Sequence, residues 1–416
     1  MRLLALGRDA KLNGRVGPFR QDFPALSRTL DGMALHYLDN AATTLKPDSV
    51  IQAIAEHYAS NGANIHRGKH RLSEEASDAY EAARVVVATY LNATAGEIVF
   101  VKNTTEALNL VAHGLGLEEE DVVVGCLDSH HSQILPWRRA ATLHLCRTDR
   151  EGRADLDHFV ELLQMRPKVV ALTHCSNVTG TVHPIADMVR EVRRAGDALI
   201  VLDAAQSIPH ERLDVARLDV DFVAFSAHKM LGPSGVGCLF GRSRHLERLK
   251  PPVLGGGTVD WVDADGHRER RVPYRLEAGT PPIADVIGFG AAIRYLEALD
   301  PSARAEHERA LTDALIGGAI ARPYLKLIGS TRAEARHPIA TLRFENKASA
   351  GEVALMLSDS YGFMCRSGYL CAQPLVTALA DVEVLRISAY LYNEVAEIGG
   401  LYEALDEIVH RLGIAA

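Results

Sequence analysis

A regular alternation of apolar strand-like runs with amphipathic helical runs, from about residue 97 onward, constrains this chain's fold more than any other feature. Residues 97–103 (EIVFVKN) and 121–126 (DVVVGC) are typical of buried strands, and residues 104–115 between them place Leu108 and Val111 on one helical face. Further strand-like segments follow at residues 168–175, 198–204, 221–227 and 235–242, with a helix expected over 183–197. The alternation predicts an α/β fold whose mainly parallel sheet is covered by helices on both faces.

The chain divides into three predicted regions. It has 416 residues, 47% of them hydrophobic, which is enough for a large core and more than one structural unit. We expect an N-terminal arm at residues 1–30 that packs with a small domain, a large domain at 31–296, and the small C-terminal domain at 297–416. Residues 73–92 have helical spacing of Ala, Tyr, Val and Leu, and the last helix should end near Gly413.

Charge and composition argue against several classes of partner. The formal net charge of -8 and the pI near 6.1 provide no basic field for nucleic acid or an anionic membrane. Only four apolar residues follow Arg2 before charges resume, too few for a signal peptide, and no segment is long and apolar enough to span a bilayer. Six cysteines without a CxxC pair predict reduced thiols rather than a disulfide framework or a zinc site. We expect a cytoplasmic protein.

Polar residues that follow the predicted strands are the candidate site, because ligands of α/β sheets collect where the carboxyl ends of strands meet loops. These residues are Thr104, Thr105, Asn177, Asp203, Gln206, Ser226, His228 and Lys229. Taken singly, Thr104 is most simply a helix cap, Asn177 a turn residue and Lys229 a solvated charge. Taken together, a helix N-terminus for a phosphate, a carboxylate and an amine are the parts that hold pyridoxal 5'-phosphate (PLP).

Seven segments carry a specific resemblance. They are DNAATT (39–44), NIHRGKHRLS (64–73), DSHHSQILPW (128–137), SNVTG (176–180), LDAAQSIPH (202–210), SAHKMLGPSGVG (226–237) and EAGTP (277–281). These segments occur in the same order as in the class V aminotransferase family and extend over nearly the whole chain, so the sequence resembles that family. Within it, the sequence is similar to the cysteine desulfurase and selenocysteine lyase branch whose active cysteine lies in a short RxGxxCA motif. The resemblance implies a fold-type I PLP-dependent transferase with a seven-stranded type of sheet, a smaller α+β C-terminal domain and a homodimer.

The resemblance also implies roles in cofactor binding. Lys229 would bind PLP covalently and then act as the base that moves the α-proton, and Asp203 would pair with the ring nitrogen. The other cofactor residues would be Asn177 and Gln206 at the ring, His130 stacked on it and assisting proton transfer, Thr105, Ser226 and His228 at the phosphate, and Thr280 from the other subunit.

Residues 364–375 (MCRSGYLCAQPL) are the second decisive stretch. Cys371 matches the persulfide-forming cysteine of the RxGxxCA motif, and Arg386 matches the arginine that binds the substrate carboxylate, with Asn177 and His66 as further substrate contacts. The implied reaction converts L-cysteine to L-alanine and passes sulfur from Cys371 to an acceptor protein or small thiol. Only a thiolate is nucleophilic, so Cys371 needs a cationic or partly exposed setting.

Departures from the family pattern keep other reactions open. Tyr369 and Leu370 replace two histidines that are usual beside the cysteine, Ala227 stands where glycine is common, and Cys365 is a second thiol near the site. The alternatives are selenocysteine lyase activity, a related C–S lyase, or a decarboxylating enzyme of specialised metabolism. A nucleotide-binding scaffold that uses residues 232–237 (GPSGVG) is a weaker reading, because the Lys-Ser/Thr of a phosphate-binding loop does not follow.

Overall fold

The computed structural model describes residues 19–345 and 348–413. Its α-helices are α1 (Asp48–Ser60), α2 (Arg71–Tyr90), α3 (Thr104–Gly114), α4 (His131–Ala140), α5 (Leu156–Leu163), α6 (Ile185–Ala195), α7 (Val215–Leu218), α8 (Ser243–Leu246), α9 (Ile283–Glu297), α10 (Pro301–Ile320), α11 (Ala350–Tyr361), α12 (Gln373–Leu379) and α13 (Val395–Arg411). None of these helices is long and apolar enough to cross a membrane.

A seven-stranded sheet forms the centre of the larger part, in the order β4-β10-β9-β8-β7-β5-β6. The strands are β4 (Ile98–Val101), β5 (Val122–Cys126), β6 (Thr142–Cys146), β7 (Val169–Thr173), β8 (Leu199–Asp203), β9 (Phe222–Ser226) and β10 (Gly237–Gly241). Strand β10 is antiparallel to both of its neighbours, and the pairs from β9 to β6 are all parallel. The predicted α/β class with a mainly parallel sheet is confirmed.

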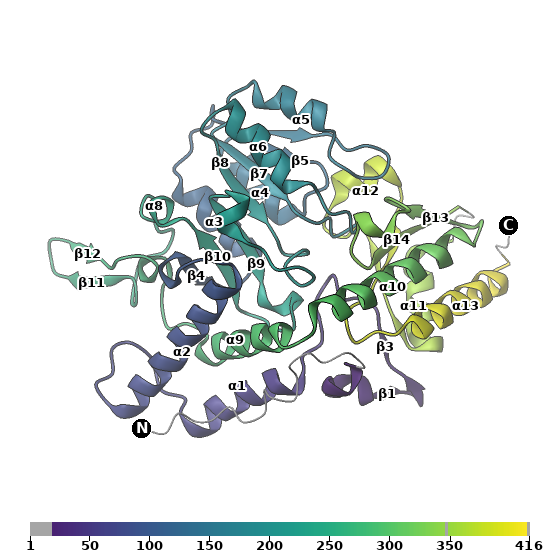
Figure 1. Ribbon diagram of the computed structural model, residues 1–416, viewed down its shortest axis with the longest axis horizontal. Coiled ribbons are helices and arrows are strands. Elements are labelled where there is room, and N and C mark those ends of the chain that lie inside the picture. The colour runs from purple at the N-terminus through teal and green to yellow at the C-terminus, as the bar shows by residue number, and fades with distance from the viewer. Residues whose placement is uncertain (1–18, 346–347, 414–416) are drawn as a thin grey trace.

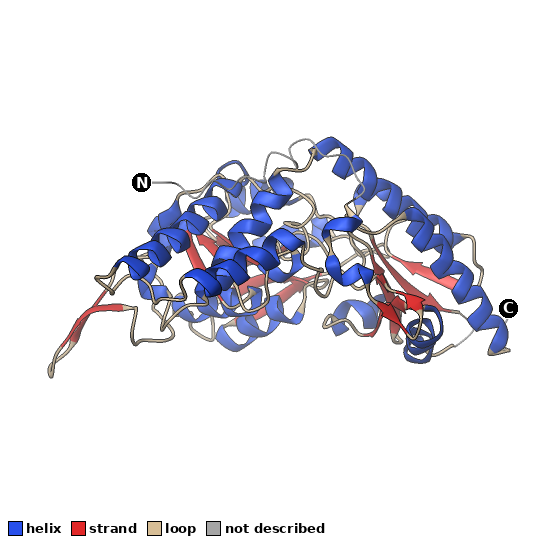
Figure 2. Ribbon diagram, turned by 90° about the horizontal axis from the view of Figure 1, so that it is seen from below, coloured by secondary structure: helices blue, strands red, loops and turns tan. Residues whose placement is uncertain are grey.

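Helices cover both faces of this sheet, as Figure 2 shows. Strand β4 illustrates the consequence: Ile98 and Phe100 belong to the core on one face, and Val99 and Val101 to the core on the other. Successive strand residues point to opposite faces, so a strand covered on both sides must be apolar at every position. Polar side chains are therefore confined to the strand ends.

A second sheet lies in the C-terminal part. Its strands β13 (Leu325–Ile328), β14 (Ile339–Phe344), β17 (Val384–Ser388) and β16 (Arg366–Gly368) are antiparallel neighbours in that order. Helices α10 and α11 both pack with α13 and enclose a separate apolar core. The short strands β1 (Thr29–Leu30) with β2 (Met33–Ala34), β11 (Val259–Val262) with β12 (His267–Glu269), and β3 (His36–Tyr37) with β15 (Phe363–Met364) form three small pairs.

The segment around residue 39 connects the two parts. Strand β3 pairs in parallel with β15, and Asp39 forms a bridge with Ser388 of β17, so residues 36–39 lie against the second sheet. The side chain of Thr44 also donates to the His228 carbonyl at 3.1 Å, which places the following residues against the first sheet. The domain boundaries predicted near residues 30 and 296 stay predictions, and residues 1–18 of the predicted arm lie outside the described residues.

The described end of the arm contacts both parts. The Phe23 ring lies 6.0 Å from that of Tyr295 on α9 and 4.5 Å from that of Tyr392, which follows β17. Arg20 donates to Glu397 of α13 at 2.8 Å. Ring packing and one ion pair therefore hold residues 19–27 at the junction.

Local predictions agree closely with the structure. Helix α2 buries Ala76, Tyr80, Ala83 and Val87 on one face, and the expected helices at 104–115 and 183–197 are α3 and α6. Gly413 follows α13 with a φ of 66°, the left-handed conformation that commonly ends a helix. Strand β6 was not predicted, because its residues 142–146 (TLHLC) include polar Thr142 and His144 and three of the five are only half-buried at the sheet edge.

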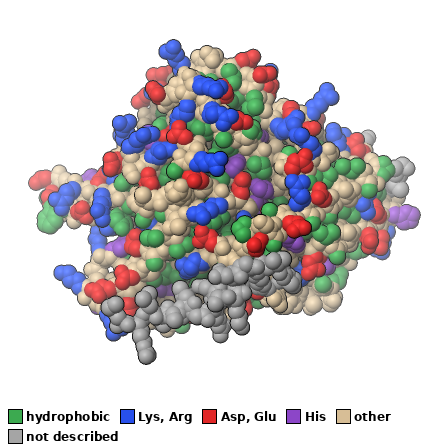
Figure 3. All heavy atoms as spheres, in the orientation of Figure 1, with side chains coloured by type: hydrophobic (Ala, Val, Ile, Leu, Met, Phe, Trp, Pro, Cys, Tyr) green, Lys and Arg blue, Asp and Glu red, His purple; other side chains and the backbone are tan. Residues whose placement is uncertain are grey.

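Positive and negative side chains alternate over the face drawn in Figure 3. No broad area of one sign covers that face, which agrees with a formal net charge of only -8 on 416 residues. Long-range steering of a polyanion needs a clustered field, which this face does not present.

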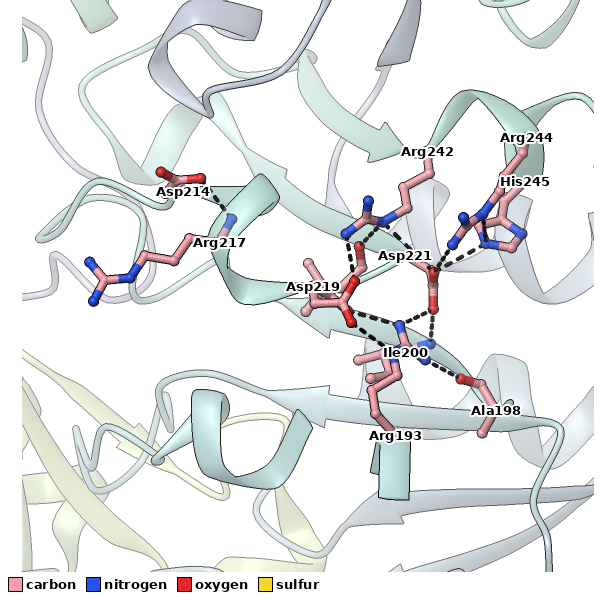
Figure 4. A network of polar contacts seen from close by, with 11 residues as sticks. Arg193, Ala198, Ile200, Asp214, Arg217, Asp219, Asp221, Arg242, Arg244 and His245 are labelled. Carbon is pink, nitrogen blue, oxygen red and sulfur yellow. Dashed lines mark hydrogen bonds and ion pairs between the residues drawn. The ribbon is translucent and has the colours of Figure 1, made fainter. Parts of the chain in front are cut away.

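A buried aspartate connects several elements at the amino end of strand β9, opposite the polar strand ends (Figure 4). Asp221, just before β9, is 1% exposed and accepts from the Ile200 backbone N–H at 2.9 Å and from Arg193 at 2.8 Å. Its other oxygen lies 3.1 Å from Nε2 of His245 in α8. Arg242 joins this network through an ion pair with Asp219, whose Oδ1 lies 2.9 Å from Nη2 of the arginine. One carboxylate thus connects α6, β8, β9 and α8 at the end of the sheet opposite the polar strand ends.

We expect Asp221→Ala to lower the free energy of unfolding by about 3 kcal/mol or more, because it removes the partner of a buried N–H group and of several cations. The midpoint of urea unfolding, followed by far-UV circular dichroism, measures this loss. Asp78→Ala, on the exposed face of α2, is the matched control and should leave the midpoint nearly unchanged. Equal midpoints for both variants would contradict the assignment.

Candidate active site

The polar ends of β5, β7, β8 and β9 and the start of α3 converge on one cavity of about 490 Å³. Ten of the residues predicted from sequence line it: Thr105, His130, Asn177, Asp203, Gln206, Ser226, His228, Lys229, Cys371 and Arg386. Eight of them follow strands of the first sheet, and Cys371 and Arg386 come from the C-terminal part. The site therefore lies where the two sheets meet.

Lys229 ends the short 3-10 helix Ala227–Lys229 that follows β9. Burial lowers the pKa of its amine from 10.5 to about 8, against the opposing charge of Asp203, and Arg386 lowers it further. A substantial fraction of neutral amine is therefore present near pH 8. A neutral lysine amine is the nucleophile that attacks an aldehyde.

Asp203 stands at the end of β8, the central strand of the sheet, and is 6% exposed. Its carboxylate accepts from the Ala205 N–H at 2.9 Å. Burial raises its pKa above the usual value, and the Ala205 N–H and the Lys229 charge oppose this shift. A carboxylate at this depth is suited to pair with a buried cationic ring nitrogen.

Gln206 and Asn177 are held by backbone carbonyls from distant segments. The Gln206 amide donates to the Ala41 carbonyl at 2.7 Å, and the Asn177 amide donates to the Leu370 carbonyl at 2.8 Å. Both side chains are almost fully buried. These bonds orient the two amides and also tie residues 41 and 370 to the end of the first sheet.

His130 begins α4 as its N-cap residue. Its Nδ1 accepts from the Ser132 N–H at 3.1 Å, which leaves the Nε2 edge of the ring for other partners. Burial lowers the pKa of His130 to about 3, and the charge of Lys229 adds to the effect, so the ring is neutral at neutral pH. A neutral, half-buried imidazole is suited to stack on an aromatic ring.

The N-terminus of α3 forms a cradle of hydroxyl and backbone donors. The Thr104 N–H donates to the Ser226 hydroxyl at 2.8 Å, and the hydroxyls of Thr105 and Ser132 are 2.7 Å apart. His228 lies beside them, and burial lowers its pKa to about 4. The hydroxyl groups and the dipole of α3 favour an anion at this position.

Two arginines and one aspartate form a charged group that the sequence reasoning missed. Arg386, 2% exposed, donates to Asp39 at 2.9 Å and to the Asn177 carbonyl at 3.1 Å, and its Nε has no partner among the described residues. Arg366 donates to the other oxygen of Asp39 at 3.0 Å. Asp39 belongs to the DNAATT segment and Arg366 begins the RxGxxCA motif, so both motifs contained the signal.

Cys371 lies on a loop with unusual backbone geometry. Leu370 and Cys371 have φ values of 55° and 54°, a left-handed conformation that is costly for both residue types. The His131 N–H donates to the Cys371 carbonyl at 2.9 Å and anchors the loop to the start of α4. All six cysteines are free, and Cys371 is the exposed one. Burial raises the pKa of the Cys365 thiol, which makes it a poor nucleophile.

Two predicted residues lie away from this cavity. His66 bonds to Glu81 at 2.9 Å and packs against the rings of Tyr80 and Tyr274. Thr280 lines a different cavity of about 630 Å³, together with residues of α3 and α4. Thr280 was predicted to act from the other subunit, and both assignments stay predictions.

The donor set fits PLP. The cavity offers a helix N-terminus for the phosphate, a buried carboxylate for the ring nitrogen, a neutral imidazole for the ring face and an amine of lowered pKa for the aldehyde. Together with the seven-stranded mixed sheet, this arrangement defines a fold-type I PLP-dependent enzyme.

Comparison with known proteins identifies the group more closely. Residues 36–401 match the Aminotransferase class-V family, whose members use PLP, and the chain belongs to this family. It is 40% identical over 411 residues to a probable cysteine desulfurase of Streptomyces coelicolor, covering 95% of this chain and 97% of that protein. It is 38% identical over 408 residues to a cysteine desulfurase of an Enterobacter species, and the match covers 96% of this chain and 99% of that protein.

Solved structures agree with the sequence comparison. The fold matches the apo structure of a cysteine desulfurase from Thermococcus onnurineus with a TM-score of 0.88 at 35% identity, covering 94% of this chain and 97% of that one. It also matches the cysteine desulfurase CsdA from Escherichia coli, in an S-sulfonic acid form, with a TM-score of 0.86 at 32% identity. This match covers 94% of this chain and 98% of that one.

The pKa of Lys229 predicts how the apoprotein binds PLP. Only the neutral amine attacks the aldehyde, so the rate of covalent attachment should rise with pH up to about 8 and then level off. Stopped-flow absorbance of the apoprotein mixed with PLP at a series of pH values measures this rate. A rate that still rises steeply near about pH 10, as for an ordinary lysine, would contradict the prediction.

Asp203→Asn extends the same experiment. The carboxylate raises the pKa of Lys229, so its removal should move the inflection of the rate profile to lower pH. Asp78→Asn on the exposed face of α2 is the control and should leave the inflection in place. An inflection that moves upward in Asp203→Asn would show that the two groups are not coupled as described.

Proposed function

We propose that this chain is a PLP-dependent cysteine desulfurase that converts L-cysteine to L-alanine and retains the sulfur as a persulfide on Cys371. The observation that carries the proposal is the position of Cys371, an exposed thiol that lines the same cavity as Lys229 and Arg386. A transaminase or decarboxylase needs the amine and the arginine but has no use for a thiol at the cavity mouth. The relatives described above point to the same reaction.

Arg386 is the proposed anchor of the substrate carboxylate. Its guanidinium already binds one carboxylate, that of Asp39, at 2.9 Å, and its unpartnered Nε leaves a donor for another. An arginine fork can make two parallel charge-assisted hydrogen bonds to a carboxylate. The amide of Asn177, held beside Arg386, would complete the contact.

Lys229 and His130 are the proposed proton carriers. When bound, PLP supplies an electron-withdrawing ring that stabilises negative charge on the substrate α-carbon. Lys229, with its lowered pKa, removes the α-proton as the neutral amine and returns a proton later. His130 is neutral and lines the cavity, and because its Nδ1 accepts from the Ser132 N–H, the ring proton lies on Nε2 and can be donated from there.

Cys371 is the proposed acceptor of sulfur. Its thiolate forms a bond to the substrate sulfur, the bond from that sulfur to the β-carbon breaks, and the β-carbon gains a proton, so that cysteine plus thiol becomes alanine plus persulfide. The balance requires no external oxidant or reductant. Because Cys371 is exposed, an acceptor protein or a small thiol can then reach the persulfide.

The second subunit of a homodimer belongs to this proposal through Thr280. Within one chain Thr280 lies in a separate cavity beside the start of α9, so it would contribute to a phosphate site only across an interface. Sedimentation velocity of the PLP-bound protein tests the dimer.

Cys371→Ser should abolish both products of the reaction. Removing the only exposed thiol leaves no acceptor for sulfur, so alanine formation should fall to the rate without enzyme, and intact-mass analysis after exposure to L-cysteine should show no added sulfur at residue 371. Cys365→Ser is the matched control and should retain both signals, since the Cys365 thiol has a raised pKa. Full turnover in Cys371→Ser would favour a C–S lyase instead.

Arg386→Lys tests substrate binding separately from sulfur transfer. A lysine keeps the charge but loses the paired hydrogen bonds, which are worth about 1.5–3 kcal/mol, so kcat/KM for L-cysteine should fall about 10- to 100-fold. Steady-state alanine release measures the change. Cysteamine, which has no carboxylate, is the control ligand, and its affinity should be equal in the variant and the parent protein. An unchanged kcat/KM would exclude Arg386 as the anchor.

A further inference from the structure

A group of histidines and glutamates lies at the seam between the two parts, outside the active-site cavity. His174 follows β7, and His210 and Glu211 follow β8, all in the first part. Glu308 lies on α10 and His337 just before β14, both in the second part. We refer to these five residues as the seam cluster. None of them has a role in the chemistry described above.

The members of the seam cluster are close to one another. Nδ1 of His210 lies 3.0 Å from a Glu308 oxygen, and the His210 and His337 rings stack with centroids 4.3 Å apart. One oxygen of Glu211 lies 3.4 Å from Nε2 of His174 and 3.7 Å from Nε2 of His337. Ligand atoms of His210, Glu308 and His337 all lie within 4.8 Å of one another.

Several polar atoms of the cluster have no hydrogen-bond partner among the described residues. They are Oε1 of Glu308, Oε1 of Glu211, Nε2 of His337 and Nδ1 of His174. Glu308 is only 7% exposed, and a buried carboxylate oxygen without a partner is costly. These unsatisfied atoms come from both parts of the chain and are available to a further group between them.

The charges at the seam favour a cation. Glu211 contributes a carboxylate from the first part and Glu308 a second one from α10. Arg304 lies beside the cluster and donates to the His210 backbone carbonyl at 2.8 Å. Two carboxylates and the unpartnered ring nitrogen of His337 form a ligand set that suits a divalent ion.

The chemical type of the ligand atoms determines which metal ions a site prefers. Imidazole nitrogens suit zinc and similar transition metals, whereas magnesium and calcium prefer oxygen alone. Zinc binds nitrogen and carboxylate oxygen at about 2.0–2.2 Å, so two ligand atoms of a tetrahedral site are about 3.4 Å apart. The present limit of 4.8 Å therefore requires a small contraction and rotation of one of the two stacked rings about its Cβ–Cγ bond.

We propose that His210, Glu308 and His337, with Glu211 as the fourth ligand, form a site for a divalent transition metal of the zinc type. The ion would bridge the loop after β8 to α10 and to the segment before β14, and so hold the first sheet against the C-terminal part. Nε2 of His174 lies 3.4 Å from Oε1 of Glu211, where it could orient that carboxylate as a partner outside the ligand shell. The site is separate from Cys371 and independent of the desulfurase proposal.

Calorimetric titration of Zn²⁺ into the full-length PLP-bound protein tests the site, after treatment with a chelator and in a Cys371→Ser background that removes the thiol of the active site. One strong site is expected, and Glu308→Gln and His337→Gln should each weaken it at least about tenfold. Mg²⁺ should not compete. His410→Gln, on the exposed face of α13, is the control and should bind as the parent protein does. Equal affinity in the parent and both ligand variants would overturn the proposal.

Anomalous diffraction at the zinc absorption edge provides a second readout that does not require any variant to fold. Crystals of the parent protein grown with Zn²⁺ should show a peak between His210, Glu308 and His337. Peaks confined to Cys371 or to surface histidines would overturn the proposal. In the positive case, Zn²⁺ should also raise the thermal midpoint of the parent protein but not that of Glu308→Gln.

Discussion

The burial of the large sheet on both faces is the constraint on which the rest of the structure depends. A strand such as β7 or β9 is buried at every position, so it has no place for a charged side chain along its length. The first polar residues of such a buried strand therefore come at its carboxyl end, and parallel pairing brings those ends together. The same burial lowers the pKa of Lys229 and raises that of Asp203, which prepares both groups for chemistry.

The C-terminal part completes the site by electrostatics and by backbone anchoring. Asp39 binds both Arg366 and Arg386, so the two guanidinium groups are held side by side although only one carboxylate lies between them. A substrate carboxylate that reaches Arg386 must either share it with Asp39 or displace Asp39. The loop that carries Cys371 is held by α4 and by Asn177 of the first part, so the thiol stays at the mouth of the cavity while remaining exposed.

The two parts contact each other in chemically different ways at two places. At the active site the contacts are arginines, an aspartate and backbone hydrogen bonds around a cavity of about 490 Å³. At the seam cluster they are histidines and glutamates with unsatisfied buried atoms. Since Arg386 and Cys371 both come from the C-terminal part and Lys229 comes from the first part, any group that fixes the two parts relative to each other also fixes the distance between Cys371 and Lys229.

Much of the fold followed from the sequence by itself. The spacing of apolar residues determined α2, α3 and α6 and six of the seven central strands, because each depends on a local period that neighbouring residues carry. Motifs at the strand ends located Lys229, Asp203, Asn177 and Gln206, since a strand end is also a local property. Cys371 was predicted differently, from the resemblance of residues 366–372 to the RxGxxCA motif of the family.

Only the tertiary structure decided which distant segments meet. The link from Asp39 to Arg386 spans 347 positions, and no local pattern shows that Asp39 binds the arginine expected to hold the substrate. The antiparallel insertion of β10 and the edge strand β6 depend on which strands are neighbours in space. The seam cluster draws its residues from four separate segments, and single histidines and glutamates resemble ordinary surface residues until packing brings them together and removes water from around them.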